Sequence, residues 1–591
     1  MNSSTSILPR ELRHLAGKRN DTTALRQKEL GIWQVCSWSE LGLGIDQVAA
    51  GLIDLQVQPG EVVGIVSSAC RDWVLADLGG QCAGAVVAGL HATDTVESIH
   101  QHVQKLAVRV LLIEDDGLFE SIAEVGGLPQ LEHIVVFRTE GLRRATDARL
   151  LSLQELRERG AQALAKEPAL VERALASRRE TDDAVVISTA GAAEGTRTLR
   201  LSHQALLAAC SAAAAAFPDE TETRGERVLF FPLSHAVERI GSLYAGLLQG
   251  AILNFVEGQD TVFDNLREVQ PKVLQAVPRF WEKLRSNLAV ELNEATGAQQ
   301  WLYRRSVGLG LRMQQVEDPQ RPTPAVIRWI FRALDLLVLS NLRRIMGLGR
   351  LRVGVVVGGS ASPEMITWFR SMGVDLRHAW SCAEMGGFVC VGGASDAPDS
   401  VGRPLPGLEV RVAGNGELLV RSAHFPVNEP WHRTGDLGTI DSNGRVYVAG
   451  RFDDVIVTAQ GEEVQPAELE RRIKASPYIA DAIVVGQERP HLACLVVLNR
   501  EAVEQWAQKR QVPFSDLRSL CDSEEVRELV ADEVERTAVG TQSQRVRTVK
   551  PIALMSDGDP STYTPSLSLK RASVLGRFAS TVEGLYRPAA V

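Results

Sequence analysis

No two of the eight cysteines form a CxxC pair, and no histidine stands at the spacing that zinc-binding motifs use. This pattern gives no sign of a zinc finger or of a disulfide framework, and it predicts free thiols in a reducing compartment. The cysteines are Cys36, Cys70, Cys82, Cys210, Cys382, Cys390, Cys494 and Cys521.

Long runs of basic residues are also missing. The 64 Lys and Arg residues are outnumbered by 73 Asp and Glu residues, which gives a formal net charge of -9. Nucleic-acid-binding proteins carry clusters of Lys and Arg that neutralise phosphates. The charge pattern therefore predicts no nucleic-acid partner.

A long apolar segment is the third absent feature. The start of the chain, MNSSTSILPRELRHL, has no apolar stretch of the kind that secretory signals carry. No other stretch approaches the ~20 apolar residues that a membrane-spanning helix needs. We expect a cytoplasmic protein whose contact with a membrane is peripheral.

The length of 591 residues exceeds the roughly 250 to 300 residues that one hydrophobic core sustains, so two or more domains are expected. Short β-branched runs, each followed by a helix-like segment, predict parallel strands with crossover helices. Because the runs are continuously apolar, these strands should be buried on both faces. The runs are 62–67, 108–113, 133–137, 184–187, 228–231, 272–277 and 351–357.

The pattern changes along the second half of the chain. Segment 298–348 is rich in Leu, Arg and Trp and predicts two or three helices. Short strands with Gly or Asn-Gly turns follow at 408–412, 416–421 and 445–449, which predicts a small antiparallel subdomain. A helix at 466–475 and strands at 482–486 and 492–498 then predict a separate α+β unit.

The predicted fold class is therefore α/β. We expect a large N-terminal domain, residues 1–452, that combines parallel-rich sheets and helices with the small β subdomain. A small mobile α+β domain, residues 453–591, should follow it.

Several segments of this sequence resemble one enzyme family. The segment WHRTGDLGTIDSNGRVYVAGRFDDVIVTAQGEEVQPAELE, residues 431–470, resembles the signature that joins the two domains of AMP-forming acyl-CoA synthetases. FFPLSHAVERIGSLYAGLLQGA and VVVGGSASPEMITWFRSMGVDLRHAWSCAEMGG are similar to the core of the same family. VLQAVPRFWEKL is typical of its long-chain fatty acid branch.

This resemblance implies an activity, its substrates and its cofactors. ATP and a fatty acid would form an acyl-adenylate with release of pyrophosphate, with Mg²⁺ bridging the phosphates. The small domain would then rotate so that coenzyme A attacks the adenylate.

The resemblance also implies which residues hold the nucleotide. Asp436 would accept hydrogen bonds from both ribose hydroxyls, and Arg451 would supply a cationic fork near the ribose and α-phosphate. Trp380 stands where the family stacks an aromatic ring on adenine. Gly358 and Gly359 would let adenine lie against backbone, and close packing of strand and helix is the alternative.

Other site residues follow from the same resemblance. Glu384 matches the Mg²⁺-binding glutamate, since a hard carboxylate suits a hard cation. His235 matches a position at the carboxylate end of the acyl pocket, and Trp281 is a candidate wall of an acyl tunnel; core packing is the alternative for both. Gly461 resembles the turn that approaches the pantetheine channel, and Asp453 occupies the hinge position.

The phosphate loop departs from the family pattern. In STAGAAEGTRTLRLSH, residues 188–203, the residues Thr189, Gly191 and Arg197 keep matching chemistry. Alanines replace hydroxyl residues at three positions, and a glutamate replaces a glycine. We expect the lost donors and the added anion to weaken phosphate binding. The replaced positions are Ala190, Ala192, Ala193 and Glu194.

A second departure lies near the C-terminus. In YTPSLSLKRASVLGRF, Ser568 aligns with the family's adenylation lysine, and Lys570 follows two residues later. In an extended segment, positions two apart share one face about 7 Å apart, so Lys570 could act from a shifted loop. Ala383 also replaces a threonine beside Glu384.

Three hypotheses remain open from the sequence. The first is a working long-chain fatty acid-CoA ligase with variant phosphate contacts. The second is a catalytically impaired homologue that binds acyl chains or acyl-adenylate, or that regulates a partner enzyme. The third is an acyl-AMP ligase that delivers its acyl group to a carrier protein. The oligomeric state is not predicted.

Overall fold

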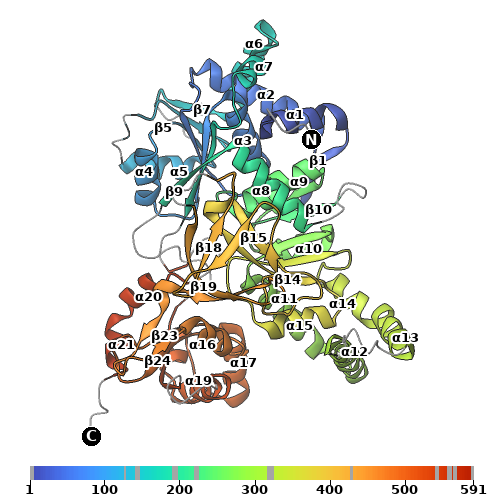
Figure 1. Ribbon diagram of the computed structural model, residues 1–591, viewed down its shortest axis with the longest axis vertical. Coiled ribbons are helices and arrows are strands. Elements are labelled where there is room, and N and C mark those ends of the chain that lie inside the picture. The colour runs from blue at the N-terminus through green and yellow to red at the C-terminus, as the bar shows by residue number, and fades with distance from the viewer. Residues whose placement is uncertain are drawn as a thin grey trace.

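The computed structural model describes residues 6–125, 128, 130–139, 147–189, 197–217, 225–315, 325–425, 430–538, 545–554, 562–563 and 569–586. Figure 1 shows two sheets and their helices along the long axis of the molecule, with the C-terminal domain at one end. A helical arm projects beside that domain. No helix in these residues is both long and apolar enough to span a bilayer.

The first sheet has seven strands in the order β7-β6-β5-β3-β4-β8-β9. Its neighbouring strands are parallel except at the edge, where β8 and β9 are antiparallel. The predicted buried parallel strands are confirmed here, because β3 and β4 are buried along their whole length. The strands are β3 (Val62–Val66), β4 (Val86–Leu90), β5 (Val108–Ile113), β6 (His133–Val136), β7 (Leu150–Ser152), β8 (Asp183–Thr189) and β9 (Arg197–Ser202); the helices are α2 (Trp38–Asp54), α3 (Arg71–Ala83), α4 (Val96–Lys105), α5 (Asp116–Val125), α6 (Leu153–Lys166) and α7 (Leu170–Ala176).

The second sheet has nine strands in the order β16-β15-β14-β13-β12-β10-β11-β1-β2. Its central pairs are parallel, and antiparallel strands extend it at both edges. The strands are β1 (Thr23–Glu29), β2 (Ile32–Ser37), β10 (Glu226–Leu229), β11 (Ile252–Phe255), β12 (Val273–Ala276), β13 (Val353–Val356), β14 (Leu376–Cys382), β15 (Gly387–Val391) and β16 (Arg403–Pro404). The accompanying helices are α1 (Leu8–Arg19), α8 (His203–Ala216), η1 (Val237–Tyr244), α9 (Ala245–Gln249), α10 (Val262–Val269), α11 (Pro278–Glu294), α15 (Pro363–Ser371) and η3 (Ala383–Met385).

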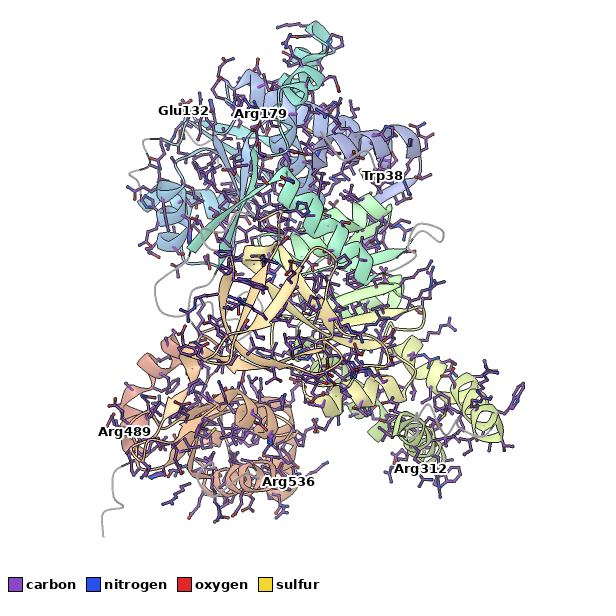
Figure 2. All side chains as sticks on the ribbon, in the orientation of Figure 1. Trp38, Glu132, Arg179, Arg312, Arg489 and Arg536 are labelled. Atoms are coloured by element: carbon purple, nitrogen blue, oxygen red, sulfur yellow. The ribbon has the colours of Figure 1, made fainter. Side chains whose placement is uncertain are left out.

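One core cluster joins the two sheets. It contains Trp38, which is labelled in Figure 2 and is 1% exposed at the start of α2. Trp281 belongs to a second cluster, in which its ring meets Phe369 edge-on and its N–H donates to the carbonyl of Val355 at 3.3 Å. Trp281 is fully buried and packs the core, and its role as the wall of an acyl tunnel stays a prediction.

A buried ion pair links α3 of the first sheet to η1 of the second. Arg239 donates to Asp77 at 2.5 Å, and both side chains are fully buried. Tyr244 donates to the other carboxylate oxygen of Asp77 at 2.5 Å, while Arg239 also donates to the carbonyl of Val87 on β4 at 3.2 Å. These bonds satisfy the charges that the apolar surroundings would otherwise penalise.

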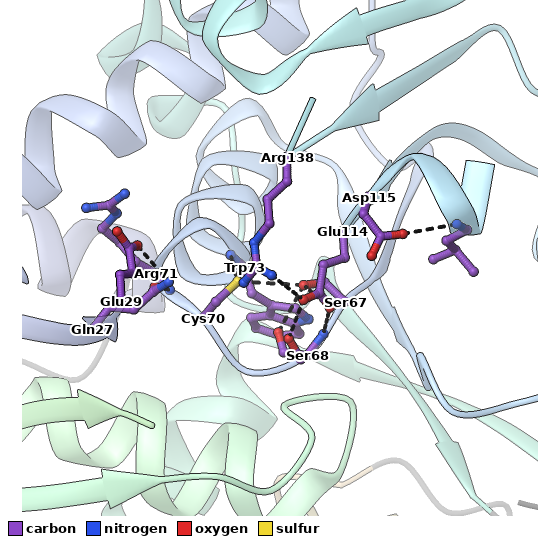
Figure 3. A network of polar contacts seen from close by, with 11 residues as sticks. Gln27, Glu29, Ser67, Ser68, Cys70, Arg71, Trp73, Glu114, Asp115 and Arg138 are labelled. Atoms are coloured by element: carbon purple, nitrogen blue, oxygen red, sulfur yellow. Dashed lines mark hydrogen bonds and ion pairs between the residues drawn. The ribbon is translucent and has the colours of Figure 1, made fainter. Parts of the chain in front are cut away.

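The loop after β3 is tied to the end of β5, as Figure 3 shows. Glu114 accepts hydrogen bonds from the backbone N–H of Ser68 at 2.7 Å and from its hydroxyl at 2.8 Å, and it pairs with Arg138 at 3.4 Å. Cys70 caps α3 by accepting the N–H of Trp73. The polar network therefore fixes the carboxyl edge of the parallel strands, where open α/β sheets bind ligands.

The predicted helices of segment 298–348 form the arm, whose Arg312 lies at its outer surface in Figure 2. The predicted antiparallel subdomain is a four-stranded sheet, β17 to β20. The arm contains α12 (Gly297–Gln315), α13 (Ala325–Leu334), η2 (Asp335–Leu339) and α14 (Ser340–Ile345), and the small sheet contains β17 (Glu409–Val412), β18 (Glu417–Arg421), β19 (His432–Ile440) and β20 (Val446–Arg451).

The chain leaves β20 through η4 and enters the small α+β domain, as predicted. A three-stranded sheet, β23-β24-β25, forms its centre. Arg489 and Arg536 lie at the domain surface in Figure 2. The elements are η4 (Phe452–Asp454), β21 (Ile456–Val457), β22 (Glu463–Val464), α16 (Pro466–Ile473), β23 (Ile479–Val485), β24 (Leu492–Leu498), α17 (Arg500–Arg510), α18 (Leu517–Asp522), α19 (Glu524–Thr537), β25 (Val546–Ile552), α20 (Arg571–Arg577) and α21 (Ala579–Gly584).

Candidate active site

Three of the predicted nucleotide-binding residues meet where the second sheet approaches the small β sheet. Trp380 Nε1 donates to Asp436 Oδ2 at 2.8 Å, and Arg451 Nη1 donates to Asp436 Oδ1 at 3.2 Å. Asp436 and Arg451 face each other across β19 and β20, whereas Trp380 comes from β14. Donors from two sheets therefore orient both carboxylate oxygens of Asp436.

A glycine permits this close approach. Gly435 has φ +72, and a Cβ there would lie 3.0 Å from Arg451 Nη2. Burial raises the pKa of Asp436, and the charge of Arg451 opposes this rise. Because the Arg451 side chain is half exposed, its remaining N–H groups can reach a ligand. Trp380 is only 6% exposed, and the stacking of adenine on it stays a prediction.

Glu384 lies close to this group, on the short helix η3 that follows β14. The thiol of Cys382 donates to Glu384 Oε2 at 3.2 Å, and His432 Nε2 lies 3.9 Å from the same oxygen. Glu384 and His432 are partly exposed. The predicted metal ligand therefore has a thiol and an imidazole beside it.

Sequence reasoning missed Cys382 and His432 as site residues. Cys382 stands at the end of β14, and His432 begins β19. The two are far apart in the chain, so no spacing motif connects them. The available signal was their position beside Glu384 and beside the TGD segment that contains Asp436.

His235 and Gly358 line one small cavity of about 30 Å³ beside β12 and η1. Burial, with a smaller contribution from the nearby His91, lowers the pKa of His235 to about 4. His235 is therefore neutral near pH 7 and can exchange hydrogen bonds without adding charge. The cavity is lined by Phe231, Pro232, His235, Val237, Glu238, Gln275, Ala276, Val277, Val357 and Gly358.

Glu238 in this cavity wall was also missed from the sequence. It is 3% exposed and accepts hydrogen bonds from Gln275 at 2.7 Å and from Ser242 at 3.0 Å. Burial raises the pKa of Glu238 to about 7, although these hydrogen bonds oppose the rise. A carboxyl group that titrates near neutrality therefore lies beside His235.

Lys570 of the small domain reaches the loop that follows β4 in the large domain. Burial raises the pKa of Asp94, and Lys570 opposes this rise. Burial also lowers the pKa of His91 to about 4, with smaller contributions from His102 and Lys570. His91 Nδ1 in turn lies 2.5 Å from the hydroxyl of Ser234. Lys570 and His235 thus approach the same region from different domains.

The predicted glycines take separate places. Gly358 has φ +81 at the end of β13, and Gly359 lines a second cavity of about 190 Å³ between the two domains. Gly461 has φ +79 in the turn between β21 and β22, and a Cβ there would meet no described atom within 4 Å. Asp453 lies in η4, directly after β20.

The phosphate loop is described only at its two ends. Thr189 closes β8 and Arg197 opens β9, and their backbones face each other across the antiparallel pair. The positions of their side chains are outside the described part of the chain, as are Gly191 and Ser568. The departures Ala190, Ala192, Ala193 and Glu194 lie outside it too, so the predictions for this loop and for Ser568 stay predictions.

Comparison with solved structures supports the fold. The crystal structure of the anthranilate CoA ligase AuaEII with anthranoyl-AMP matches with a TM-score of 0.70 at 18% identity, covering 98% of each chain. The adenylation domain of a carboxylate reductase from Mycobacterium chelonae matches with a TM-score of 0.73 at 17% identity, covering 99% of this chain and 92% of that one.

Curated relatives match over most of this chain. The long-chain-fatty-acid–CoA ligase FadD15 of Mycobacterium bovis is 28% identical over 576 residues, which cover 94% of this chain and 93% of the relative. The mouse (Mus musculus) long-chain-fatty-acid–CoA ligase ACSBG1 is 24% identical and covers 96% of this chain and 84% of the relative.

Two family models cover nearly the whole sequence. The model of the AMP-binding enzyme matches residues 12–424, and the model of the AMP-binding enzyme C-terminal domain matches residues 453–590. The first match alone spans more than half of the chain, and it contains Trp380 and Glu384. The chain therefore belongs to the AMP-binding enzymes, a family of adenylate-forming, acyl-activating enzymes.

Proposed function

We propose that this chain is a long-chain fatty acid-CoA ligase that forms AMP. The observation that carries the proposal is the convergence of Trp380, Asp436, Arg451 and Glu384 on one region. The long-chain ligases that match over most of the chain support the choice of a fatty acid as substrate.

The residues fit the two parts of ATP in different ways. Asp436 would accept the ribose hydroxyls, and Arg451 would donate to the ribose and α-phosphate. Glu384 fits Mg²⁺, because this ion is held by one or two carboxylates together with phosphate oxygens and water. When bound, Mg²⁺ supplies positive charge to the phosphates. Thr189, Gly191, Gly358 and Gly359 would bring backbone close to the nucleotide.

The acyl and coenzyme A ends involve other residues. His235, neutral in its cavity, would hydrogen-bond the carboxylate end of the fatty acid. Arg197 and Lys570 would supply the cations beside the reacting phosphate. Gly461 would approach the pantetheine chain after the small domain rotates about Asp453.

We expect the first half-reaction to be slow. A carboxylate about 5 Å from a phosphate charge costs on the order of 3 kcal/mol at an effective dielectric near 20, so Glu194 should oppose phosphate binding. A lost donor at developing charge costs about 3 kcal/mol more. Lys570 would offset part of this loss from its place beside Asp94.

Exchange of labelled pyrophosphate into ATP, measured with a panel of fatty acids, tests the proposal. Acid-dependent exchange that Asp436→Ala abolishes supports it, and Asp441→Ala on the turn after β19 is the matched control. Absence of exchange with every acid would favour the binding or regulatory protein. If exchange occurs, coenzyme A against a carrier protein as acceptor separates the ligase from an acyl-AMP ligase.

Peripheral membrane contact forms part of the proposal, and the arm supports it. On α13 and η2, Trp329, Leu336 and Leu337 are 69%, 74% and 68% exposed. Arg328 and Arg332 are exposed on the same helix, and Arg332 lies 5.7 Å from the ring of Trp329. A helix that combines apolar, Trp and Arg side chains in this way binds the anionic surface of a bilayer.

Sedimentation with anionic phospholipid vesicles tests this contact. We expect the double variant Trp329→Gln/Leu336→Gln to bind vesicles about tenfold or more weakly. The reason is that it removes apolar side chains that would insert into the bilayer surface. The matched control is Leu30→Gln/Ile32→Gln, which changes exposed apolar residues of the β1–β2 hairpin. Equal losses in both variants would contradict the assignment to the arm.

A further inference from the structure

Cys382, Glu384 and His432 form a compact cluster of three possible metal ligands. Their ligand atoms, Sγ, a carboxylate oxygen and a ring nitrogen, all lie within 4.8 Å of one another. Cys382 Sγ is 3.2 Å and His432 Nε2 is 3.9 Å from Glu384 Oε2. In a tetrahedral zinc site, with bonds of about 2.0 to 2.3 Å, ligand atoms stand about 3.5 Å apart. The cluster is therefore close to the size of a zinc site before any adjustment.

The chemistry of the three donors selects among metals. Mg²⁺ prefers oxygen ligands, whereas thiolate and imidazole suit softer metals. Zn²⁺ is bound by Cys sulfur, His nitrogen and Glu oxygen, and a site with three protein ligands leaves a fourth position for water or another oxygen ligand. The set around Glu384 therefore suits Zn²⁺ better than it suits Mg²⁺.

Three elements hold the cluster in place. Cys382 ends β14 and Glu384 lies two residues later on η3, while His432 begins β19 of the small sheet. The indole N–H of Trp380 on β14 donates a hydrogen bond to Asp436 on β19. This bond already fixes to each other the two strands that bear Cys382 and His432. Glu384 and His432 remain partly exposed, which leaves a path for an ion from solvent.

We infer that Cys382, Glu384 and His432 form a zinc-binding site at the edge of the active site. On binding, the sulfur–hydrogen bond of Cys382 breaks, the proton goes to solvent, and a zinc–sulfur bond forms without any change of oxidation state. In a chain with the proposed function, the same ion would compete with Mg²⁺ for Glu384. That consequence rests on the proposed function, whereas zinc binding itself does not.

Calorimetric titration of the full, metal-free chain with Zn²⁺ alone tests the inference. We expect one ion per chain, and we expect Cys382→Ser and His432→Phe each to weaken binding by more than about tenfold, the loss that removing even an outer-shell partner causes. Cys36→Ser on β2 and His424→Phe, an exposed histidine, are the matched controls and should bind as the unaltered chain does.

Titration with Co²⁺ alone gives a second readout that a loss of folding cannot imitate. Coordination by Cys382 should produce a thiolate-to-cobalt charge-transfer band, which Cys382→Ser removes while His432→Phe weakens it. Circular dichroism of each metal-free variant checks its fold. Absence of one-to-one zinc binding, or binding that neither variant weakens, would overturn the site whether or not the chain is a ligase.

Discussion

At the scale of single residues, burial sets the charge state of the groups in and around the small cavity that His235 and Glu238 line. Burial lowers the pKa of His91 and of His235 to about 4, so both rings are neutral at pH 7. Burial raises the pKa of Glu238 to about 7. The two effects have one cause, since an apolar environment disfavours whichever form is charged.

Glu238 should therefore make stability depend on pH. Its carboxyl group keeps its proton in the folded chain up to about pH 7 but loses it near pH 4.5 in the unfolded chain. Its contribution to stability is fully present below pH 4.5 and is lost as the pH rises through 7, by about 3 kcal/mol. Glu238→Gln has no such proton to lose.

Urea unfolding of Glu238→Gln and of the unaltered chain between pH 4.5 and 7.5 measures this contribution. The variant should gain relative stability of about 3 kcal/mol across the interval, because the histidine contributions are common to both proteins and cancel. The exposed Glu120→Gln serves as control. A constant difference between Glu238→Gln and the unaltered chain would show that Glu238 is ionised in the fold.

At the scale of elements, the buried ion pair between Asp77 on α3 and Arg239 on η1 gives the clearest stability prediction. Asp77→Asn would leave the charge of Arg239 buried without a counterion, which costs about 3 to 5 kcal/mol. Urea unfolding followed by circular dichroism should show a lower midpoint. Asp72→Asn on the same helix removes a partly exposed partner of Arg71 and should cost less than about 1 kcal/mol. If Asp77→Asn lowered the free energy of unfolding as little as Asp72→Asn is expected to, the buried ion pair would not be needed for stability.

The strands were predictable because they are continuous β-branched runs; β5 and β24 have the predicted bounds, 108–113 and 492–498. The antiparallel pairing of β8 with β9 and the π-helical form of η1 were not, since long-range packing decides both. Asp436, Arg451 and Glu384 came from family motifs. Cys382 and His432 meet only where β14 of the second sheet approaches β19 of the small sheet, which no local pattern encodes.

At the scale of the whole molecule, the two domains meet across a charged cavity of about 190 Å³. Arg279 and Glu282 come from the large domain, and Arg471, Lys474 and Arg571 come from the small one. Burial raises the pKa of Glu282, and the charge of Lys474 opposes this rise. A polar interface of this kind can open and rehydrate at low cost, which suits the rotation of the small domain that the proposed function needs.

The position of Lys570 across this interface leads to a kinetic prediction. If Lys570 acts as proposed, Lys570→Ala should slow ATP–pyrophosphate exchange by about tenfold or more, because the reacting phosphate would lose a cation, while Lys509→Ala on exposed α17 should not. Ser568→Lys should speed exchange.

Acyl-adenylate supplied ready-made should be converted to acyl-CoA faster than ATP drives the full reaction. Equal rates for the two routes would contradict the expectation of a slow first half-reaction.

The eight cysteines have a practical consequence. All are buried, and burial raises the pKa of every thiol, so the reactive thiolate is scarce in the folded chain. A maleimide label added to the native protein would therefore attach only as segments open. Labelling of Cys494 and Cys521 would report opening of the small domain, and labelling of the other six cysteines would report opening of the large domain. Each domain therefore carries its own probes of local unfolding.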